Sequence, residues 1–336
     1  MGRSTTIVDV AQAAGVSKST VSNVVRGAEP VSDETRRRVQ AAIERLNYTP
    51  NGIARQFVKR RTTMVGVLVG DLGNHYHAHL AQAVERALFH RGHTAMFCNV
   101  DGDEDLAVAG VEALLEQRVA GFVLMGQVER AAQVAASLRA SEAPVVTIGL
   151  RQGWSDSVGP RDREGGRLAA SHLLDRGHRR IAYVRTSSAE AGADRARHAG
   201  YASALRAAGI DPLPPILWDP GSVAIATALQ PPGAPTAAVV WNDHTAVALI
   251  DACEAAGIHV PATLSVVGFD DIDVARLGRI SLTTVAQPLD LQAEKAVAML
   301  LDRIDAGPAG RPRHVSVPVE LRIRRSTAPA RRSARR

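Results

Sequence analysis

Short apolar runs alternate with helical stretches along most of this chain. Three such runs are MVGVLV (64–69), GFVLMG (121–126) and PVVTIG (144–149). An apolar run without polar alternation is typical of a parallel strand that is covered on both faces. The alternation restarts with a helix predicted at 163–177 and the run RIAYVR (180–185). Two successive series of strands and helices predict two doubly wound α/β lobes.

The same pattern predicts where a ligand would bind. Ligands of doubly wound sheets lie beyond the carboxyl ends of the strands, so a site is expected in the cleft between the two lobes. The other strands of the two series are predicted at 94–100, 236–241 and 264–269. The other helices are predicted at 76–91, 105–118, 129–141, 194–208 and 243–257.

The first sixty residues have a different pattern, which predicts three short helices. Apolar residues recur at helical spacing from Thr6, and Gly15 then ends the first helix. Ser17 is a suitable N-cap for a second helix, and a third runs from Ser32 to about Leu46. A glycine-containing turn of about three residues between the first two helices is typical of a helix-turn-helix. The alternative is a plain three-helix bundle, which needs no exposed polar row at the start of its second helix.

The distribution of charge along the chain says more about possible partners than the net charge of +6 does. Residues 1–61 hold eleven Lys/Arg and five Asp/Glu, and residues 322–336 hold seven Arg and no acid. Residues 62–321 therefore carry a net charge of about −7. A basic N-terminal segment on an acidic body fits an anionic partner such as nucleic acid. Charge alone leaves a solvated, arginine-rich surface equally open.

Composition excludes several classes of protein. Cys98 and Cys253 are the only cysteines and form no CxxC pair, which argues against a disulfide framework or a zinc ribbon. No signal sequence is recognisable, and no stretch reaches the roughly 18 apolar residues that a membrane helix needs. A cytoplasmic protein without a membrane partner is expected. Apolar residues make up 46% of the chain, which is sufficient to form hydrophobic cores. Because only 4% of the residues are aromatic, these cores are expected to be mostly aliphatic.

Two sets of motifs resemble one known family, in order along the chain. DVAQAAGVSKSTVSNVVRG followed by VSDETRRRVQAAIERLNYTPNGIARQF resembles the lactose/galactose repressor (LacI/GalR) family. DLGNHYHAHL, REGGRLAASHLLDRGHRRIAYV, VVWNDHTAVAL, VPATLSVVGFDDI, LTTVAQP and VELRIRRST are similar to the sensor domain of that family, which has the periplasmic-binding-protein fold. The resemblance runs from about residue 6 to 327. It implies an N-terminal all-α helix-turn-helix domain followed by an α/β sensor domain of two doubly wound lobes.

The resemblance also implies domain boundaries. The expected parts are a helix-turn-helix domain (1–50), a hinge helix (51–61), an effector-binding domain (62–327) and a disordered basic tail (328–336). Within the effector-binding domain, the N-lobe would comprise about 62–156 and 287–316, and the C-lobe about 157–286 and 317–327. A plain linker is the alternative for residues 51–61.

By this resemblance, Lys18, Ser19 and Asn23 take the base-reading positions of the recognition helix. Phosphate contacts, which position a protein without reading sequence, are implied for Thr6, Ser17, Thr20, Ser22 and Tyr48. Asn51, Ala54 and Phe57 belong to the hinge helix, where Phe57 replaces the usual leucine wedge of the minor groove. Many relatives have Arg at the position of Asn23. Since Asn favours adenine edges and Arg guanine, the operator is expected to differ from the usual one.

The resemblance places an effector site in the expected cleft. Arg197, Asn242 and Asp270 take positions that bind polar groups of the effector, and Asp71, Asn74, Tyr76 and His77 would line the opposite lobe. Arginine donors and a carboxylate acceptor suit the hydroxyl groups of a sugar. A nucleoside or another polar metabolite is the alternative. Without the resemblance, an Asp after a strand such as Asp270 is more often an N-cap than a ligand.

Alternating His75, His77 and His79 invite a metal hypothesis, but a helix would bring only His75 and His79 to one face. No metal or other cofactor is expected. An enzyme is not expected either, because the chain has no P-loop, GxSxG or HExxH motif. A secreted solute-binding protein would need a signal peptide.

The expected function is therefore that of a DNA-binding transcriptional regulator, most simply a repressor controlled by a small-molecule effector such as a sugar. A homodimer on a palindromic operator is expected, and the tail lacks the leucine heptads by which some relatives form tetramers. The sequence leaves open whether the effector is an inducer or a corepressor.

Overall fold

The computed structural model describes residues 5–26, 31–48, 62–126, 132–149, 151–187, 191–219, 225, 229, 233–307 and 310–330. The chain divides into two compact units, Met1–Thr62 and Thr63–Arg336, called here the headpiece and the C-terminal unit. No helix in the described ranges is both long enough and apolar enough to cross a membrane.

The described part of the headpiece contains the three predicted helices, α1 (Ile7–Ala14), α2 (Lys18–Arg26) and α3 (Asp33–Arg45). Each helix buries the apolar stripe that its sequence predicts, and the shared core includes Val10, Val21 and Val39, all with no exposed surface. The helix-turn-helix prediction is confirmed.

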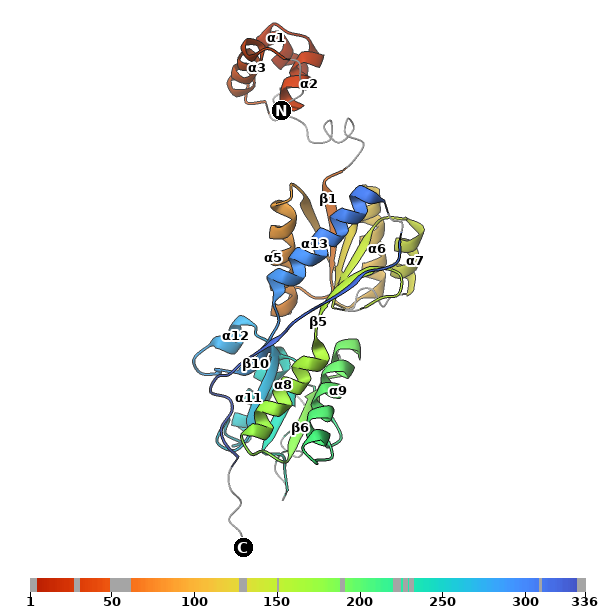
Figure 1. Ribbon diagram of the computed structural model, residues 1–336. Coiled ribbons are helices and arrows are strands. Elements are labelled where there is room, and N and C mark those ends of the chain that lie inside the picture. Colours follow the sequence, from red (N-terminus) through yellow and green to blue (C-terminus); the bar gives the residue numbers. More distant parts are fainter. Residues whose placement is uncertain are drawn as a thin grey trace. The chain divides into compact units, whose positions relative to one another are not determined.

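The C-terminal unit contains two six-stranded sheets, one in each lobe (Figure 1). The sheet of the first lobe has the order β11-β5-β4-β3-β1-β2, and all neighbouring strands are parallel. Its strands are β1 (Met64–Val69), β2 (Thr94–Asn99), β3 (Phe122–Met125), β4 (Val145–Ile148), β5 (Asp156–Pro160) and β11 (His314–Val317). One face is covered by α5 (His75–Phe89) and α13 (Leu289–Ala306), and the other by α6 (Glu104–Glu116) and α7 (Ala132–Ala140).

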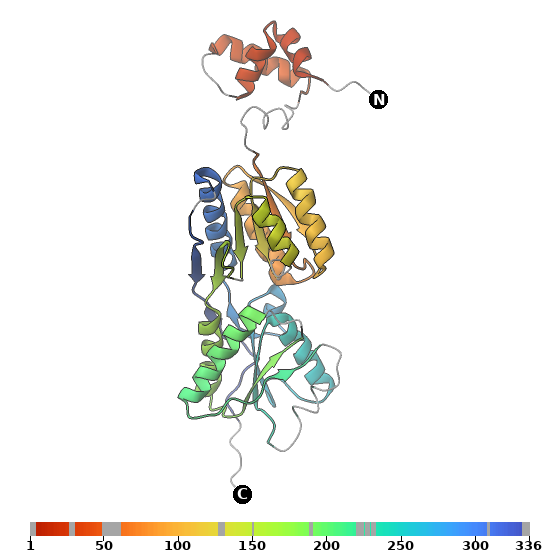
Figure 2. The ribbon, with the colours of Figure 1, turned by 90° about the vertical axis from the view of Figure 1, so that its right-hand side faces the viewer.

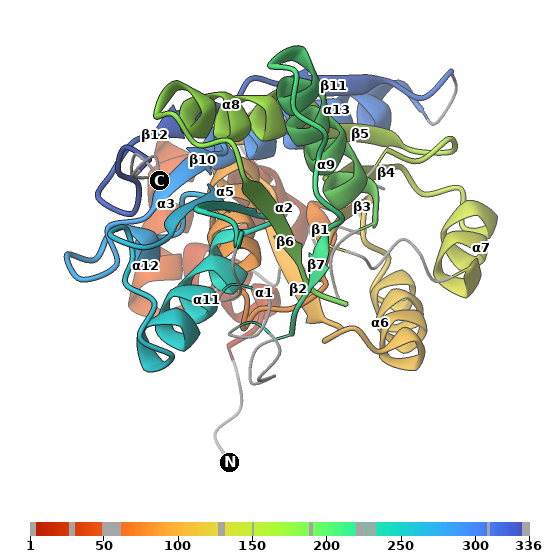
Figure 3. The same ribbon diagram turned by 90° about the horizontal axis from the view of Figure 1, so that it is seen from below.

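The second lobe repeats this architecture with the strand order β12-β10-β9-β8-β6-β7. Its strands are β6 (Ile181–Arg185), β7 (Ile216–Leu217), β8 (Ala237–Val240), β9 (Ser265–Asp270), β10 (Thr283–Ala286) and β12 (Glu320–Arg322), and only β12 is antiparallel to its neighbour. Figures 2 and 3 show α8 (Asp162–Asp175) and α9 (Ala191–Ala207) on one face of this sheet. The other face is covered by α11 (Asp243–Ala255), beside the short helix α12 (Asp273–Arg276).

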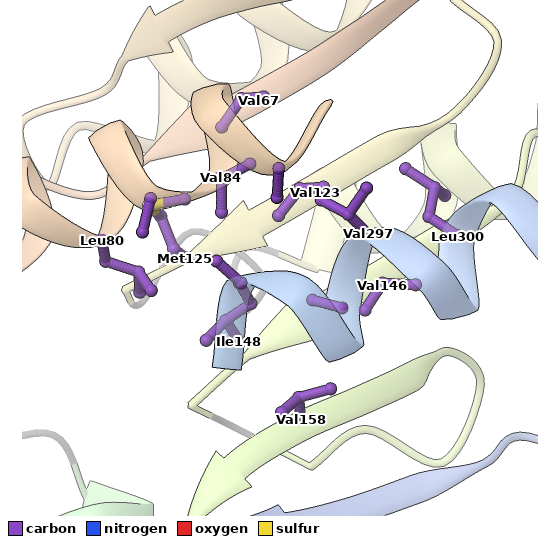
Figure 4. Close-up of a cluster of buried hydrophobic side chains, with 14 of the residues drawn as sticks. Val67, Leu80, Val84, Val123, Met125, Val146, Ile148, Val158, Val297 and Leu300 are labelled. Carbon is purple, nitrogen blue, oxygen red and sulfur yellow. The ribbon is translucent and has the colours of Figure 1, made fainter. Parts of the chain in front are cut away.

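Burial of both faces explains why the strands are continuous apolar runs. In β1, Val67 faces the core under α5 and α13, while the adjacent Leu68 faces the core under α6 and α7. Figure 4 shows the first of these cores, to which Leu80 and Val84 of α5 and Val297 of α13 all belong. The predicted pair of doubly wound lobes is confirmed.

The chain crosses between the lobes three times, and the first crossing differs from the expected one. β5 pairs with β4 and β11, so the chain leaves the first lobe after Pro160 rather than at about residue 156. The polar, glycine-containing sequence of β5 hides this strand from a search for apolar runs. The other crossings lie between β10 and α13 and between β11 and β12.

The start of the C-terminal tail is ordered, contrary to expectation. The Ala328 amide donates to Ser265 Oγ at 3.0 Å, and the Ala330 amide donates to the carbonyl of Arg176 at 2.8 Å. The carbonyl of Ala328 lies 3.0 Å from His178 Nε2. Backbone hydrogen bonds to the second lobe therefore order residues that composition alone assigns to disorder. Residues 331–336 lie outside the described ranges.

Candidate DNA-binding surface and candidate effector cavity

The turn between α1 and α2 is fixed by α3. Gly15 ends α1 in the left-handed conformation, with φ of +63°, which glycine adopts at low cost. Arg38 of α3 donates from Nη2 to the carbonyls of Ala14 and Gly15, at 2.6 and 3.3 Å. A Cβ atom at Gly15 would lie only 2.8 Å from this Nη2 atom. The angle between the two helices therefore depends on a glycine and on a partly buried contact of the third helix.

The start of α2 presents a polar surface. Ser17 Oγ accepts from the Thr20 amide at 3.1 Å and lies 2.7 Å from the hydroxyls of Ser19 and Thr20. Lys18 and Ser19 are exposed, whereas Ser22 and Asn23 are half-buried. The Ser17 hydroxyl is thus an N-cap, as its position predicts, in addition to any contact with DNA.

The other predicted DNA contacts have structural roles of their own. Thr6 is the exposed N-cap of α1 and forms a capping box with Asp9, whose carboxylate accepts from the Thr6 amide at 2.7 Å. Tyr48 is half-buried against the core of the headpiece. The predicted hinge residues Asn51, Ala54 and Phe57 lie outside the described residues.

A cavity lies where the two lobes face each other, at the carboxyl ends of their strands. Its lining includes six of the seven predicted effector residues: Asn74, Tyr76, His77, Arg197, Asn242 and Asp270. Gly149, Pro160, Asp162, Ala193 and Trp241 complete the lining. Residues more than 190 positions apart in the sequence therefore share one site, as the resemblance implies.

Arg197 is the central cation of this cavity and is buried. Its Nε donates to Asp162 Oδ1 at 2.8 Å, and its Nη1 donates to the Trp241 carbonyl at 2.6 Å and lies 3.8 Å from Asp270 Oδ1. The guanidinium carbon stacks 3.6 Å above the centroid of the Phe269 ring. Burial by itself lowers the pKa of Arg197, but the two carboxylates outweigh it and raise that pKa. Nη2 has no hydrogen-bond partner among the described residues and remains available as a donor.

Asp270 is held in place by a turn at the end of β9. Asp270 and Asp271 have φ of +117° and +60°, conformations that residues with a side chain rarely adopt. The buried Asp243 supports this turn, because its Oδ2 accepts from the Ile272 amide at 3.1 Å. Asp243 Oδ1 pairs with the Thr284 hydroxyl at 2.6 Å. Burial, and to a lesser extent the charge of Asp270, raises the pKa of Asp243 well above its ordinary value.

Gln287 links Asp270 to the first lobe. Its Nε2 donates to Asp270 Oδ1 at 2.7 Å, and its Oε1 accepts from the Tyr76 hydroxyl at 3.3 Å. Gln292 of α13 also donates to Gln287 Oε1, at 3.1 Å. Gln287 lies in the crossing between β10 and α13, so it connects the effector cavity to a segment that joins the lobes.

The side of the cavity that the first lobe forms is built at the start of α5. Asn74 caps this helix, with its Oδ1 accepting from the Tyr76 amide at 3.0 Å. His77 Nδ1 lies 3.1 Å from the Asp71 carbonyl, which orients the imidazole. Asp71 itself is not among the lining residues, and its carboxylate accepts from the Gly73 amide at 2.6 Å. Asp71 is thus a turn-forming residue, and its contact with an effector stays a prediction.

Asn242 combines both roles that its position suggests. Its Oδ1 accepts from the Thr245 amide at 2.9 Å and caps α11. Its Nδ2 group has no hydrogen-bond partner among the described residues, so it can donate to a ligand in the cavity.

Asp162, Trp241 and Gln287 were not singled out from the sequence. Asp162 follows β5, whose polar sequence hides the strand, and Gln287 follows β10, which was not predicted either. Trp241 lies at the end of a predicted strand. Their places at the carboxyl ends of strands are the signal that could have found them.

The alternating histidines do not form a metal site in the described structure. His79 Nε2 lies 3.3 Å from Asp273 Oδ2 of α12 in the other lobe. No group of three or more potential ligands among His, Cys, Asp and Glu converges within the described ranges.

Comparisons with known proteins give the same reading for both units. A family profile described as "Bacterial regulatory proteins, lacI family" matches residues 6–51, and one described as "Periplasmic binding protein-like domain" matches residues 170–327. The ribose operon repressor of Escherichia coli (strain K12) is 34% identical over 308 residues, which cover 89% of this chain and 93% of the relative. The transcriptional regulator DegA of Bacillus subtilis (strain 168) is 31% identical and covers 97% of this chain and 98% of the relative.

Solved structures agree with the fold. The lac repressor dimer bound to operator and the anti-inducer ONPF matches with a TM-score of 0.84 at 30% identity, covering 97% of this chain and all of that one. A LacI family transcriptional regulator from Enterococcus faecium with bound ribose matches with a TM-score of 0.68 at 30% identity. That match covers 80% of this chain and all of the other.

Proposed function

The chain belongs to the lacI family of bacterial transcriptional regulators, and we propose that it is a homodimeric repressor whose affinity for a palindromic operator is controlled by a sugar bound between its lobes. The expectation that it is not an enzyme agrees with this membership. The effector cavity carries the proposal, because hydrogen-bonding groups and aromatic rings from both lobes converge there.

The chemistry of the cavity favours a polyhydroxyl ligand. Arg197 Nη2 and Asn242 Nδ2 are available donors, and the carboxylate of Asp270 is an acceptor. Tyr76 and Trp241 add aromatic surface, which suits the apolar face of a sugar ring. Relatives named for ribose, and one with ribose bound, make ribose the first sugar to test.

Sugar control would act through the angle between the lobes. The cavity is lined from both lobes, so a ligand that contacts both stabilises one relative orientation over others. Such a ligand changes operator affinity only if its affinity differs between the operator-binding conformation and the others.

For DNA binding, we propose that α2 enters the major groove with Lys18, Ser19 and Asn23 reading bases. The proposed phosphate contacts are Thr6, Ser17, Thr20, Ser22 and Tyr48. The hinge residues Asn51, Ala54 and Phe57 are proposed to contact the minor groove. A relative solved as a dimer on its operator supports two headpieces on inverted half-sites.

Selection of bound duplexes from a random library by the full-length protein tests the DNA-binding proposal. We expect a palindrome of roughly 14–20 base pairs. Lys18→Ala should weaken binding to it about tenfold or more, since a good base contact contributes roughly 1–3 kcal/mol. Lys295→Ala, which removes an exposed lysine of α13, is the matched control. Equal effects of the two substitutions would contradict base reading by α2.

Calorimetric titration and operator binding with and without sugars test the effector proposal. Arg197→Lys should weaken the sugar more than about tenfold, because lysine cannot replace the stacked, three-way contact of the guanidinium. Arg167→Lys, on the exposed side of α8, should leave sugar affinity unchanged. Operator binding that no sugar alters would contradict the proposal.

A further inference from the structure

A second cavity lies in the first lobe, at the end of the sheet opposite the effector cavity. Its described lining comes mainly from the ends of α7 and α13 and from the amino ends of β4 and β5. The effector cavity lies at the carboxyl ends of the strands, and no described residue lines both cavities. This second cavity, called here the α7 cavity, is therefore separate from the effector cavity.

The size and the walls of the α7 cavity suit a single aromatic ring. Its volume is about 180 Å³, whereas an apolar cavity of about 150 Å³ is sufficient to bind benzene. The walls include the buried Leu138 and Val145 and the half-buried Pro144 and Trp154. A six-membered ring with one or two small polar groups fits this space and removes apolar surface from water.

Arg139 supplies an oriented cation at the α7 cavity. Its Nε donates to the Ala135 carbonyl at 3.1 Å, and its guanidinium carbon lies 5.9 Å from the centroid of the Trp154 ring. Within the described ranges, Nη1 and Nη2 have no hydrogen-bond partner and Arg139 forms no ion pair. The N–H donors of a guanidinium match the two oxygens of a carboxylate. A ligand carboxylate would therefore meet donors that the protein already holds in place.

Ser155 supplies a hydroxyl group to the same cavity. The residue is only 4% exposed, and its Oγ has no hydrogen-bond partner in the part of the chain that the structure describes. A buried hydroxyl without a partner lowers stability, and such groups are rare in folded proteins. Because Ser155 lies in the wall of the α7 cavity, a rotation about its Cα–Cβ bond can pair Oγ with a hydroxyl group on a ligand.

The carboxylates that line the α7 cavity leave Arg139 available. Burial raises the pKa of Asp156, but hydrogen bonds from Arg303 and Arg313 outweigh it and hold that pKa below its ordinary value. The Asp156 carboxylate is thus paired with two arginines, at 2.9 Å from Arg303 Nη2 and 3.0 Å from Arg313 Nε. Glu142 is exposed, so solvent screens its charge.

We infer that the α7 cavity is a second ligand site, which binds a small aromatic carboxylate with one ring, such as a hydroxybenzoate. The ring packs against Leu138 and Trp154, the carboxylate pairs with Arg139, and a ring hydroxyl pairs with Ser155. This site goes beyond the proposed function, because it shares no described residue with the effector cavity and does not require that a sugar binds there.

Calorimetric titration of the full-length protein with benzoate, the three hydroxybenzoates, benzamide and acetate tests the inference. We expect at least one aromatic carboxylate to bind once per chain, with a Kd of about 1 mM or less. Benzamide lacks the charge and acetate lacks the ring, so each should bind about tenfold more weakly or worse. Equal affinities for benzoate and benzamide would contradict the pairing with Arg139.

Arg139→Gln tests the cation. It should weaken the binding of benzoate about tenfold or more, because a hydrogen-bonded charge pair is lost. Arg206→Gln is the matched control, since Arg206 is also an exposed arginine in the last turn of a helix, α9, and does not line the α7 cavity. Equal losses in the two variants would mean that benzoate binds the surface non-specifically, which would overturn the inference.

Ser155→Ala should change stability and binding in opposite directions. Removing an unpaired buried hydroxyl should raise Tm by roughly 2 °C or more. The wild-type protein should bind its preferred hydroxybenzoate about threefold or more tightly than benzoate, and this preference should disappear in the variant. Scanning calorimetry and titration measure the two effects. A preference that survives in Ser155→Ala would exclude Ser155 from the site.

The outcomes separate this inference from the proposed function. If no aromatic carboxylate bound to the wild-type protein at millimolar concentrations, the α7 cavity would not be a site of this kind, and sugar control of operator binding would still stand. If an aromatic carboxylate bound as expected while no sugar altered operator binding, the proposed function would fail and the second site would remain.

Discussion

At the scale of single residues, the effector cavity depends on a strained turn. Asp270 and Asp271 have positive φ, and such backbone persists only where the surroundings hold it. Asp243 provides that support. Its side chain has no exposed surface and accepts hydrogen bonds from the Ile272 amide and the Thr284 hydroxyl. Asp243 is therefore a positioning residue for Asp270, although it does not line the cavity.

Even the smallest side chain at position 268, that of alanine, should destabilise the protein. A Cβ atom there would lie 2.1 Å from Asp243 Oδ1 and 2.9 Å from Leu282 Cδ2. Gly268→Ala must displace the carboxylate that supports the Asp270 turn, so we expect a loss of roughly 1–3 kcal/mol in the free energy of unfolding. Urea unfolding and sugar titration measure the two consequences. Unchanged stability would show that the Asp243 contact is dispensable.

Two buried histidines near the C-terminal segment should make stability depend on pH. His172 lies 3.0 Å from the Thr327 hydroxyl, and burial, followed by the nearby charge of Arg176, lowers its pKa from 6.5 to about 4. Burial also lowers the pKa of His178. Between about pH 6.5 and 4 the unfolded chain binds more protons than the folded one, so stability must fall as pH falls through this window.

His172→Gln keeps a side chain that can donate and accept but does not titrate. The fall in unfolding free energy from pH 7 to pH 4 should be smaller in this variant than in the wild-type protein, with the remainder due to His178 and other groups. Urea unfolding at several pH values measures it. An identical slope in both proteins would contradict the assignment.

At the scale of elements, α8 and α9 pack unusually closely because glycines lie at their contact. A Cβ atom at Gly166 would lie 1.9 Å from the carbonyl oxygen of Arg197, and one at Gly200 would lie 1.9 Å from that of Arg163. The two helices therefore approach through their backbones. This approach sets the position of Arg197 relative to Asp162, since each lies on one of the two helices.

Gly166→Ala should separate the helices and move Arg197. We expect a loss of about 3 kcal/mol or more in stability together with weaker sugar binding, because overpacking must shift a backbone here rather than a side chain. Gly153→Ala is the control, since a Cβ atom there meets nothing within 4 Å. Calorimetric titration and urea unfolding compare the two variants. If the Gly166→Ala protein is destabilised but binds sugar normally, the close packing of α8 and α9 does not determine the position of Arg197.

Sequence reasoning located most helices and strands within a few residues, and the strands that it missed have a feature in common. The predicted helix 163–177 is α8 at Asp162–Asp175, and the predicted strand 64–69 is β1. β5, β7, β10, β11 and β12 were not predicted. All five have at most five residues and lie at or next to a sheet edge, and their short sequences carry a weak apolar signal.

At the scale of the whole molecule, the two units should unfold separately. The headpiece has its own small core, and the C-terminal unit has four larger ones. Within the C-terminal unit, the two lobes are joined to each other by contacts such as Tyr76 with Gln287 and His79 with Asp273. A ligand in the cavity should therefore stabilise the C-terminal unit alone.

Scanning calorimetry of the full-length protein tests this independence. We expect two transitions, of which a bound sugar raises only the one of the C-terminal unit. At a concentration about 100 times Kd, the gain of about 2.7 kcal/mol corresponds to a rise in Tm of roughly 5–10 °C. A single transition, or an equal rise in both, would mean that the units are energetically coupled without DNA.

The sequence by itself determined the class of protein, the order of its elements and six of the seven residues expected in the cavity. It could do so because apolar periodicity reports local burial, and because the motifs resemble those of the lacI family, whose effector site implies the cavity residues. The tertiary structure decided what those residues do. It joined Asp162 to Arg197, placed Gln287 between Asp270 and Tyr76, paired the Asp71 carboxylate with the Gly73 amide, and ordered Ala328–Ala330. Each of these depends on contacts between segments far apart in the chain, or on one hydrogen bond of a turn, which a pattern of apolar and polar residues does not encode.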